Sequence, residues 1–382
     1  MHDRPRAVAR VRSAGDVVAV HRFAVRHGIP VVPRAEGHST GGQAQVRGGI
    51  VLDVTGLAGV YGIEDDRVVV GAGTRWSEVV SASLAVGRTP PVLTDYLDLS
   101  VGGTLSVGGL GGATHRHGAQ TDNVLELDVV TPDGRHVTCS PATALFDAVR
   151  AGRGRAGTIL RATLRLAPAR PHAVTYRLRY DSLADLVADQ LLVMAEKRFD
   201  HLEGQAKPDG DRWTYCLDGT RYATDTQPDP AVLHGLRHHA EEITTIPYAD
   251  FLDRMADDVA LLRTLGPWQH PHPWTNVLLP AHATADVVSQ ALNRLRPDDI
   301  GDTGVILLYP FPRAQVTTPR LHLPTATTAF LFAVLTTAPP DNPRALHEML
   351  EDNQQLQHSA VAAGGAVYLG NIPGGGLSAR TT

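Results

Sequence analysis

A histidine in a short, glycine-bearing loop is the first group in this sequence with clear chemical potential. His38 lies in residues 34–44 (RAEGHSTGGQA), between two apolar runs that are typical of buried strands. Backbone N–H groups in such a loop can converge on an anion such as a pyrophosphate. The imidazole would then lie beside the cofactor that carries the pyrophosphate. The alternative is an ordinary loop histidine, solvated or hydrogen-bonded.

A carboxylate in an apolar neighbourhood is the second candidate. Asp95 lies near the start of residues 94–106 (TDYLDLSVGGTLS). Beside a bound cofactor, its carboxylate could accept a proton while a substrate C–H bond gives up a hydride. The alternative is an aspartate that forms a turn or caps a helix. Asp98, three residues on, would be the easier surface residue.

Six glycines follow closely in two groups, Gly102-Gly103 and residues 108–112 (GGLGG). They would let the backbone approach a flat or phosphorylated ligand closely. The alternative is a flexible loop. The interleaved Thr104 and Ser106, together with apolar residues, favour a structured site.

Residues 152–157 (GRGRAG) match the pattern GxGxxG literally. A dinucleotide-binding fingerprint requires a strand before the glycines and a helix after them. Here residues 142–150 are typical of a helix and residues 158–166 alternate like a strand. The order is reversed, so we reject an NAD site and expect an ordinary helix–strand turn.

Histidine and cysteine spacing predicts neither a metal site nor a disulfide. No third ligand stands at a motif spacing from any histidine cluster, and the two cysteines form no close pair. These residues are His115 and His117, His238 and His239, His270 and His272, Cys139 and Cys216.

The elements that must position these groups change in character near residues 167–171. Before that point, helix and strand signals alternate: a helix capped by Ser13 or Asp16 and ended by Gly28, and strands at 29–32, 50–54, 67–73 and 125–130. A further helix is expected after Thr74. Beyond the boundary, we expect strands at 174–180, 305–310 and 329–335, polar loops around 207–230, and a helix over 343–363.

Composition restricts the function classes. The chain has 382 residues, 43% hydrophobic and 20% charged, with a net charge of −5. These values are typical of a globular protein, and nothing points to nucleic acid as a partner. No apolar run has transmembrane length and the N-terminus lacks the apolar core of a signal peptide, so we expect a cytoplasmic protein with no membrane partner. The strong preference for arginine over lysine suggests a GC-rich bacterial gene.

The two motifs together resemble the FAD-linked oxidases of the vanillyl-alcohol-oxidase type, with a PCMH-type FAD-binding domain, and most closely their cytokinin-dehydrogenase-like branch. Residues 34–44 resemble the flavin loop of the family, and residues 94–106 match its Thr-Asp-Tyr-Leu-x-Leu-Ser-Val-Gly-Gly-Thr-Leu-Ser run. The match is dense over about 1–168. It is thinner beyond, where residues 201–204 (HLEG) and 272–274 (HPW) recur.

The resemblance implies an α+β fold: a FAD-binding domain over 1–170, an antiparallel-sheet substrate domain over 171–350, and a return to the FAD domain over 351–382. It implies that His38 binds the flavin covalently and that Asp95 is the catalytic base, with Glu203 as a second catalytic candidate. The cofactor would be FAD. The implied cofactor-binding residues are Ala35, Glu36, Gly37, His38, Ser39, Gln43, Asp95, Ser100, Ser106, Leu110, Ile159 and Tyr368.

The chain also departs from the family. Ala35 replaces a glycine, Arg155 and Ala156 replace the usual residues of the glycine turn, and residues 94–112 hold no cysteine for a second flavin link. The sequence stops at Thr382, before the terminal segment of the family, so we expect a shortened flavin domain.

The expected reaction is hydride transfer to the flavin from a C–H next to an amine or alcohol, with oxygen or another electron acceptor reoxidising the flavin. Two alternatives stay open: a cytokinin-type amine dehydrogenase, and a flavin- or ligand-binding protein without turnover. The partner would be a small-molecule substrate; the sequence leaves the oligomeric state open.

Overall fold

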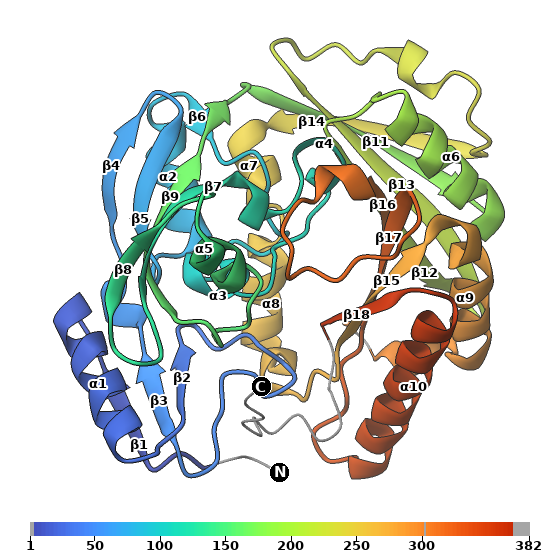
Figure 1. The fold of residues 1–382 in the computed structure, drawn as a ribbon. Helices are drawn as coiled ribbons and strands as arrows, with labels where there is room; N and C mark the ends of the chain where they lie inside the picture. The colour runs from blue at the N-terminus through green and yellow to red at the C-terminus, as the bar shows by residue number, and fades with distance from the viewer. Residues whose placement is uncertain (1–3, 302, 370–382) are drawn as a thin grey trace.

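The computed structural model of the protein describes residues 4–301 and 303–369 (Figure 1). The N-terminal layer is a three-stranded parallel sheet in the order β1-β3-β2, with strands Ala7–Arg10, Ile50–Asp53 and Val31–Arg34. Helix α1 (Ala14–Arg26) packs beside it. Ser13 and Asp16 form a capping box at the first turn of this helix, and Val17, His21 and Ala24 form its buried face. The residues between β2 and β3 form the His38 loop.

A five-stranded antiparallel sheet follows, in the order β4-β5-β9-β7-β8. Its core contains Val68, Leu127 and Phe146. Three helices lie in this part of the chain: α2 (Trp76–Leu84), α3 (Val101–Leu105) and α5 (Ala144–Val149). The strands are β4 (Val60–Glu64), β5 (Arg67–Gly71), β7 (Val124–Val130), β8 (His136–Cys139) and β9 (Thr158–Arg165).

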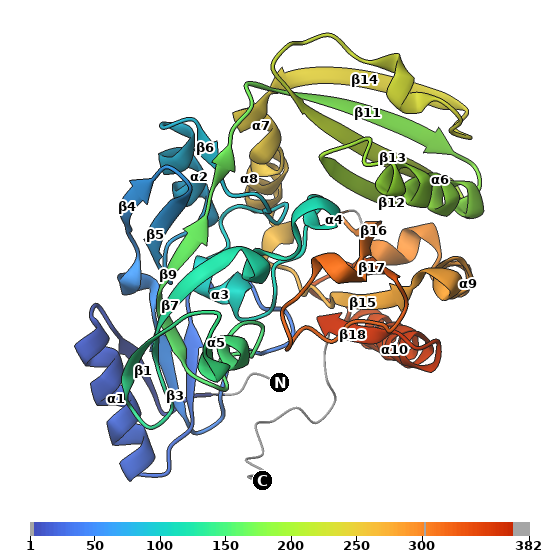
Figure 2. The ribbon, with the colours of Figure 1, turned by 45° about the horizontal axis from the view of Figure 1, so that its top comes forward.

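The largest sheet has eight strands, all paired antiparallel, in the order β14-β11-β13-β12-β16-β17-β15-β18. Helices α6 (Leu183–Ala195), α9 (Ala281–Arg294) and α10 (Pro343–Ala362) cover one face (Figure 2). The strands are β11 (His172–Tyr180), β12 (His201–Asp209), β13 (Arg212–Ala223), β14 (Ala240–Pro247), β15 (Thr275–Pro280), β16 (Val305–Pro312), β17 (Thr328–Leu335) and β18 (Ala366–Leu369).

Strand alternation gives this sheet two apolar faces. Leu308 and Phe330 belong to the core under the helices. Their neighbours Tyr309 and Leu331 belong to a second cluster on the opposite face, together with Leu110 of residues 108–112, the glycine-rich loop. The large sheet therefore presents its helix-free face to the N-terminal half of the chain.

Helices α7 (Tyr248–Leu252) and α8 (Ala256–Leu265) lie between the two halves (Figure 2). Tyr248, Phe251 and Leu252 pack into the core of the five-stranded sheet. The short elements are β6 (Arg88–Thr89), β10 (Ala167–Pro168), α4 (Thr114–His117), and the 3-10 helices at Thr55–Leu57, Gln120–Asn123, Pro230–Leu233, Pro267–Gln269 (η4), Pro297–Ile300 and Arg313–Gln315. Among the described residues, no helix has both the length and the apolarity needed to cross a bilayer.

The α+β fold with an antiparallel second sheet is confirmed, as is the helix–strand turn at 152–157, which joins α5 to β9. The prediction of polar loops around 207–230 is wrong over Arg212–Ala223, which is the long strand β13. Its Asp218, Thr220 and Arg221 hid the strand pattern, but pairing with β11 and β12 on both sides fixes it.

The predicted domain boundaries at 170 and 350 stay predictions. Helix α10 and strand β18 pack with the large sheet, so residues 351–369 lie mainly in that layer, although the Tyr368 hydroxyl accepts a hydrogen bond from Gly109 N (3.1 Å) in the glycine-rich loop. The tail over 370–382 lies outside the described residues.

Candidate active site

Four charged or ionisable side chains from three distant segments meet at one point. Asp95 comes from the irregular stretch between β6 and α3, His201 and Glu203 from β12, and Arg254 from the turn between α7 and α8. The Arg254 Nη2 donates to Asp95 Oδ1 (2.6 Å) and Glu203 Oε1 (3.3 Å), and lies 3.4 Å from His201 Nε2. This set is called the carboxylate cluster below.

Strand periodicity explains the pair on β12. His201 and Glu203 are two residues apart, so their side chains point to the same face of the sheet. Leu202 between them packs under the helices on the other face. Both polar side chains are 7% exposed, whereas Asp95 is 27% exposed and can be reached from solvent.

Burial controls the charges in the cluster. It raises the pKa of Asp95 from 3.8 to about 7, and the negative charge of Glu203 adds to the rise, while Arg254 opposes it. Burial lowers the pKa of His201 to about 3, so this imidazole stays neutral near pH 7. Burial also works against the charge of Arg254, but Glu203 and Asp95 outweigh it and raise the arginine pKa.

Asp95, His201 and Glu203 also satisfy the geometry of a metal site, because their ligand atoms lie within 4.8 Å of one another. Arg254 Nη2 contacts all three side chains and already supplies the positive charge. The set is therefore described as an ion-pair cluster, and the predicted lack of a metal stays a prediction.

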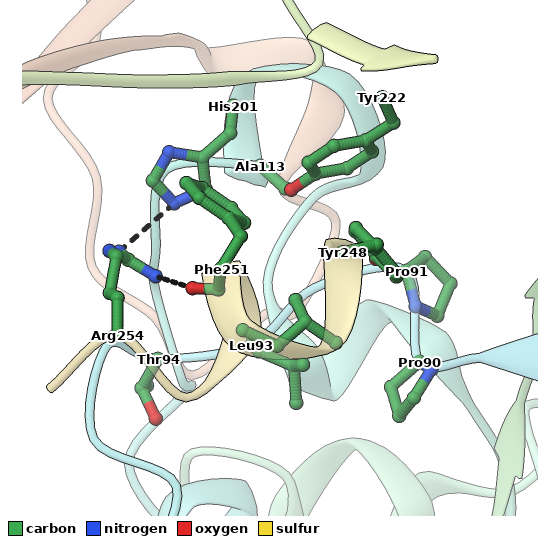
Figure 3. Close-up of a pocket in the computed structure, with 11 residues that line it drawn as sticks. Pro90, Pro91, Leu93, Thr94, Ala113, His201, Tyr222, Tyr248, Phe251 and Arg254 are labelled. Carbon is green, nitrogen blue, oxygen red and sulfur yellow. Dashed lines mark hydrogen bonds between the residues drawn. The ribbon is translucent and has the colours of Figure 1, made fainter. Parts of the chain in front are cut away.

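Figure 3 shows what lies behind Arg254. A small cavity is lined by Pro90, Pro91, Leu93, Tyr222, Tyr248, Phe251, His201 and Arg254, among others. The guanidinium lies 4.8 Å from the Phe251 ring centroid, and its Nη1 donates to the Phe251 carbonyl (3.3 Å). Helix α7 and its following turn therefore hold Arg254 against the two carboxylates.

The His38 loop has the features of an anion cradle. Within the described part of the chain, the backbone N–H groups of residues 36–40 have no hydrogen-bond partner. Gly37 has φ +78°, and a Cβ there would lie 2.6 Å from the Arg34 guanidinium. The Glu36 carboxylate accepts from Arg75 Nη2 (3.0 Å), which anchors the loop to the start of α2.

His38 lies among aromatic rings. Its ring centroid is 5.2 Å from Tyr96 and 6.0 Å from Trp268 of η4, both edge to face. Burial lowers the pKa of His38, which favours the neutral imidazole. Because Tyr96 directly follows Asp95, the chain places the histidine and the carboxylate cluster in one region. Arg263 of α8 donates to the Tyr96 hydroxyl (2.8 Å) and stacks on Trp268 (5.0 Å).

Two of the other predicted cofactor residues each pair with an arginine of another segment. The Ser100 side chain accepts a hydrogen bond from Gly103 N and caps α3. The Ser100 backbone forms an isolated antiparallel β-bridge with Arg75, the partner of Glu36. The Ser106 carbonyl accepts from Arg153 N (2.8 Å), whose side chain donates to the Tyr368 carbonyl (3.0 Å).

The Gln120 amide is buried at the glycine-rich loop. It packs against Gly109, and among the described residues neither of its polar atoms has a hydrogen-bond partner. Leu110 packs with Tyr368 in one cluster, whereas Ile159 is buried in the core of the five-stranded sheet. Ser39 and Gln43 are exposed, and Ala35 packs partly on the core beside α1.

Comparisons with known proteins bear on the same segments. Residues 5–140 match the family described as FAD binding domain, and residues 211–370 match the family described as "Cytokinin dehydrogenase 1, FAD and cytokinin binding". Cytokinin dehydrogenase 8 of Oryza sativa subsp. indica is 36% identical over 362 residues, which cover 81% of this chain and 68% of that protein. The chain belongs to the cytokinin dehydrogenase family.

Two further matches are an oxidoreductase relative and a solved structure. An uncharacterized oxidoreductase encoded by ORF5 in the fasciation locus of Rhodococcoides fascians is 40% identical over 378 residues, covering 97% of this chain and 85% of that protein. The crystal structure of 6-hydroxy-D-nicotine oxidase from Arthrobacter nicotinovorans aligns with a TM-score of 0.72 at 22% identity, covering 97% of this chain and 84% of the other. The second likeness concerns the fold.

Membership in this dehydrogenase family makes the protein a FAD-dependent oxidoreductase, and the residues present fit that cofactor. The free N–H groups of residues 36–40 could hold its pyrophosphate, and the unpartnered Gln120 amide offers polar contacts at the glycine-rich loop. The individual roles of the predicted cofactor and catalytic residues stay predictions.

Sequence reasoning missed Arg254, Tyr96, Trp268 and Arg263 as parts of the site. Arg254 lies 159 positions from Asp95 and belongs to no motif, so no local signal pointed to it. His201 was noted as part of the HLEG segment without a role. The period-two spacing of His201 and Glu203 could have placed the two on one strand face.

Proposed function

We propose that the protein oxidises a small molecule at a C–H bond next to an amine or alcohol, with Asp95 as the base. The observation that carries this proposal is Asp95 itself, a partly exposed carboxylate whose pKa is raised to about 7, beside a buried second carboxylate. A base with a pKa near the working pH is well matched to proton transfer.

FAD, when bound, supplies a two-electron acceptor for the hydride equivalent. The residues of the protein take the proton and hold the substrate. Asp95 accepts the proton of the substrate N–H or O–H, so that the lone pair left behind forms the C=N or C=O bond of the product. Arg254 and Glu203 keep the carboxylate in place while the proton moves. Oxygen or another acceptor completes the cycle.

We also propose that His38 carries the flavin covalently. Three features support this: its place in the loop with free backbone N–H groups, its neutral imidazole, and its closeness to Tyr96. Residues 94–112 contain no cysteine, so the link would be single. The bond would retain the cofactor and raise its potential.

A cytokinin-type amine is the second candidate substrate. The match of residues 211–370 to a cytokinin-binding family supports it, because this range includes Arg254 and the α7–α8 segment that covers Asp95. A secondary amine would offer both the N–H proton for Asp95 and the adjacent C–H bond.

Anaerobic titration with a substrate panel tests the proposal. Flavin-loaded protein is mixed without oxygen with cytokinin-type amines, other secondary amines and alcohols, and the flavin absorbance is recorded. An enzyme bleaches with one substrate class, and Asp95→Asn bleaches far more slowly with that same class. Absence of bleaching with every class supports the binding protein without turnover instead.

A further inference from the structure

Arg254 is positively charged and lies between the two carboxylates of the carboxylate cluster. Arg254 is held on the turn between α7 and α8, 24% exposed, with its Nη2 shared between Asp95 and Glu203. It is the basic partner of both carboxylates, since the neighbouring His201 is neutral near pH 7. With both carboxylates ionised, the three side chains carry a net charge of −1.

We propose that Arg254 is the counter-ion that lets Asp95 and Glu203 be ionised together, and that it thereby sets the pH range in which Asp95 can accept a proton. This inference rests on the proposed role of Asp95 as the base. Arg254 is a positioning residue, because it acts through its contact with the Asp95 carboxylate.

The reasoning is electrostatic. Two carboxylates that share one site cannot both ionise easily, so one of them keeps a proton to higher pH. An arginine placed between them removes most of that repulsion. Its 2.6 Å contact with Asp95 is shorter than its 3.3 Å contact with Glu203. The guanidinium also packs on the Phe251 ring and lies beside His201 (Figure 3).

Other groups facing the pair do not compete for this role. Tyr309 of β16 and Tyr222 of β13 are buried, and burial raises the pKa of each phenol well above its ordinary value, so both stay protonated. Asp218 of β13 is held by two hydrogen bonds from Arg177 (2.9 and 2.8 Å).

Charge counting gives an ordered prediction for the pH dependence of anaerobic flavin reduction. Arg254→Met leaves the ionised pair at −2 and should shift the midpoint of the rise in rate upward by about 1–3 pH units. Glu203→Gln leaves Asp95 and Arg254 with a net charge of zero and should shift the midpoint to lower pH. The double variant Glu203→Gln/Arg254→Met restores −1 and should return the midpoint close to that of the wild type.

The controls separate charge from folding. Arg254→Lys keeps the positive charge, so the midpoint pH should stay close to that of the wild type. Arg237→Met removes the arginine from another buried carboxylate, Asp189, and should leave the midpoint unchanged. Thermal melting identifies any variant that is misfolded. If Arg254→Met is misfolded, the pH profiles of Glu203→Gln and Arg254→Lys still test the proposal. A loss of rate that is equal at every pH, together with an unshifted infrared band of the carboxylic acids, would overturn the proposal.

Infrared titration of the carboxylic-acid band in substrate-free protein distinguishes this proposal from the one on which it rests. If the band titrates at a higher pH in Arg254→Met while the rate profile does not follow it, Arg254 is the counter-ion and Asp95 is not the base. If Asp95→Asn slows reduction but neither profile moves in Arg254→Met, the base assignment stands and the counter-ion proposal fails.

Discussion

The His38 loop and the carboxylate cluster prepare for their ligands in opposite ways. The loop leaves the backbone N–H groups of residues 36–40 without partners in the described structure, where residues 36–38 are half-buried and residues 39–40 are exposed. The cluster instead satisfies its charges internally, with Arg254 against both Asp95 and Glu203. Backbone groups left free suit a permanently bound anion, whereas a paired carboxylate with a shifted pKa suits a proton that comes and goes.

The same contrast explains what could be predicted from the sequence. The anion cradle is formed by one short loop, so the glycines and His38 predict it within the eleven residues 34–44. The cluster is built by contacts 51 and 159 positions apart, and its arginine lies on a helix turn with no motif. Asp95 was a candidate from its apolar neighbourhood and Glu203 only through the family resemblance, whereas Arg254 was not predicted.

The fold shows the same limit. Helix α1 and strands β16 and β17 were predicted well, because a capping box and continuous apolar runs are strong local signals. Strand β13 was missed, since its central position in the sheet, between β11 and β12, holds polar residues that would not form a strand alone.

The largest expected effect concerns the base. Asp95→Asn keeps the shape of the side chain but cannot take up the substrate proton. We expect anaerobic flavin reduction to slow by about 10²–10⁴-fold with flavin content unchanged. Stopped-flow absorbance measures it, and Asp98→Asn serves as the matched control because Asp98 bonds Ser77 and Tyr96 outside the cluster. Equal rates in Asp95→Asn and wild type would assign the base elsewhere, with Glu203 as the next candidate.

The second prediction concerns the flavin link. Acid-precipitated wild-type protein should keep its yellow colour. His38→Ala should release all its flavin to the supernatant, because residues 94–112 offer no cysteine for a second link. Absorbance of pellet and supernatant checks this result. A colourless wild-type pellet from flavin-loaded protein would contradict the covalent link without affecting the role of Asp95.

The third prediction concerns the shape of the loop. Gly37→Ala and Gly42→Ala both place a Cβ at positive φ, +78° and +76°, but only Gly37 lies within residues 36–40, whose backbone N–H groups form the anion cradle. Strain at such a position costs about 1–3 kcal/mol. Both variants should therefore lose flavin affinity, Gly37→Ala by more. Apo-protein titrated with FAD gives the two affinities; a greater loss in Gly42→Ala would contradict this account of the cradle.

The smallest effect is expected at the aromatic contact on His38. Trp268→Ala removes one edge-to-face partner worth about 0.5–1.5 kcal/mol, so flavin attachment should slow by about two- to ten-fold. Trp268→Phe keeps a ring and should attach flavin at nearly the wild-type rate. Time-resolved acid precipitation after FAD addition measures attachment, and identical rates in all three proteins would remove Trp268 from the site.

The pH dependence of anaerobic flavin reduction in the wild type tests the central claim most directly. Asp95 accepts a proton only when it is ionised, and its pKa is raised to about 7. The rate constant should therefore increase with pH and level off above a midpoint near 7, and Asp95→Asn should lose that increase. A rate that is flat from pH 5 to pH 9, or an increase that persists unchanged in Asp95→Asn, would contradict the assignment of Asp95 as the base.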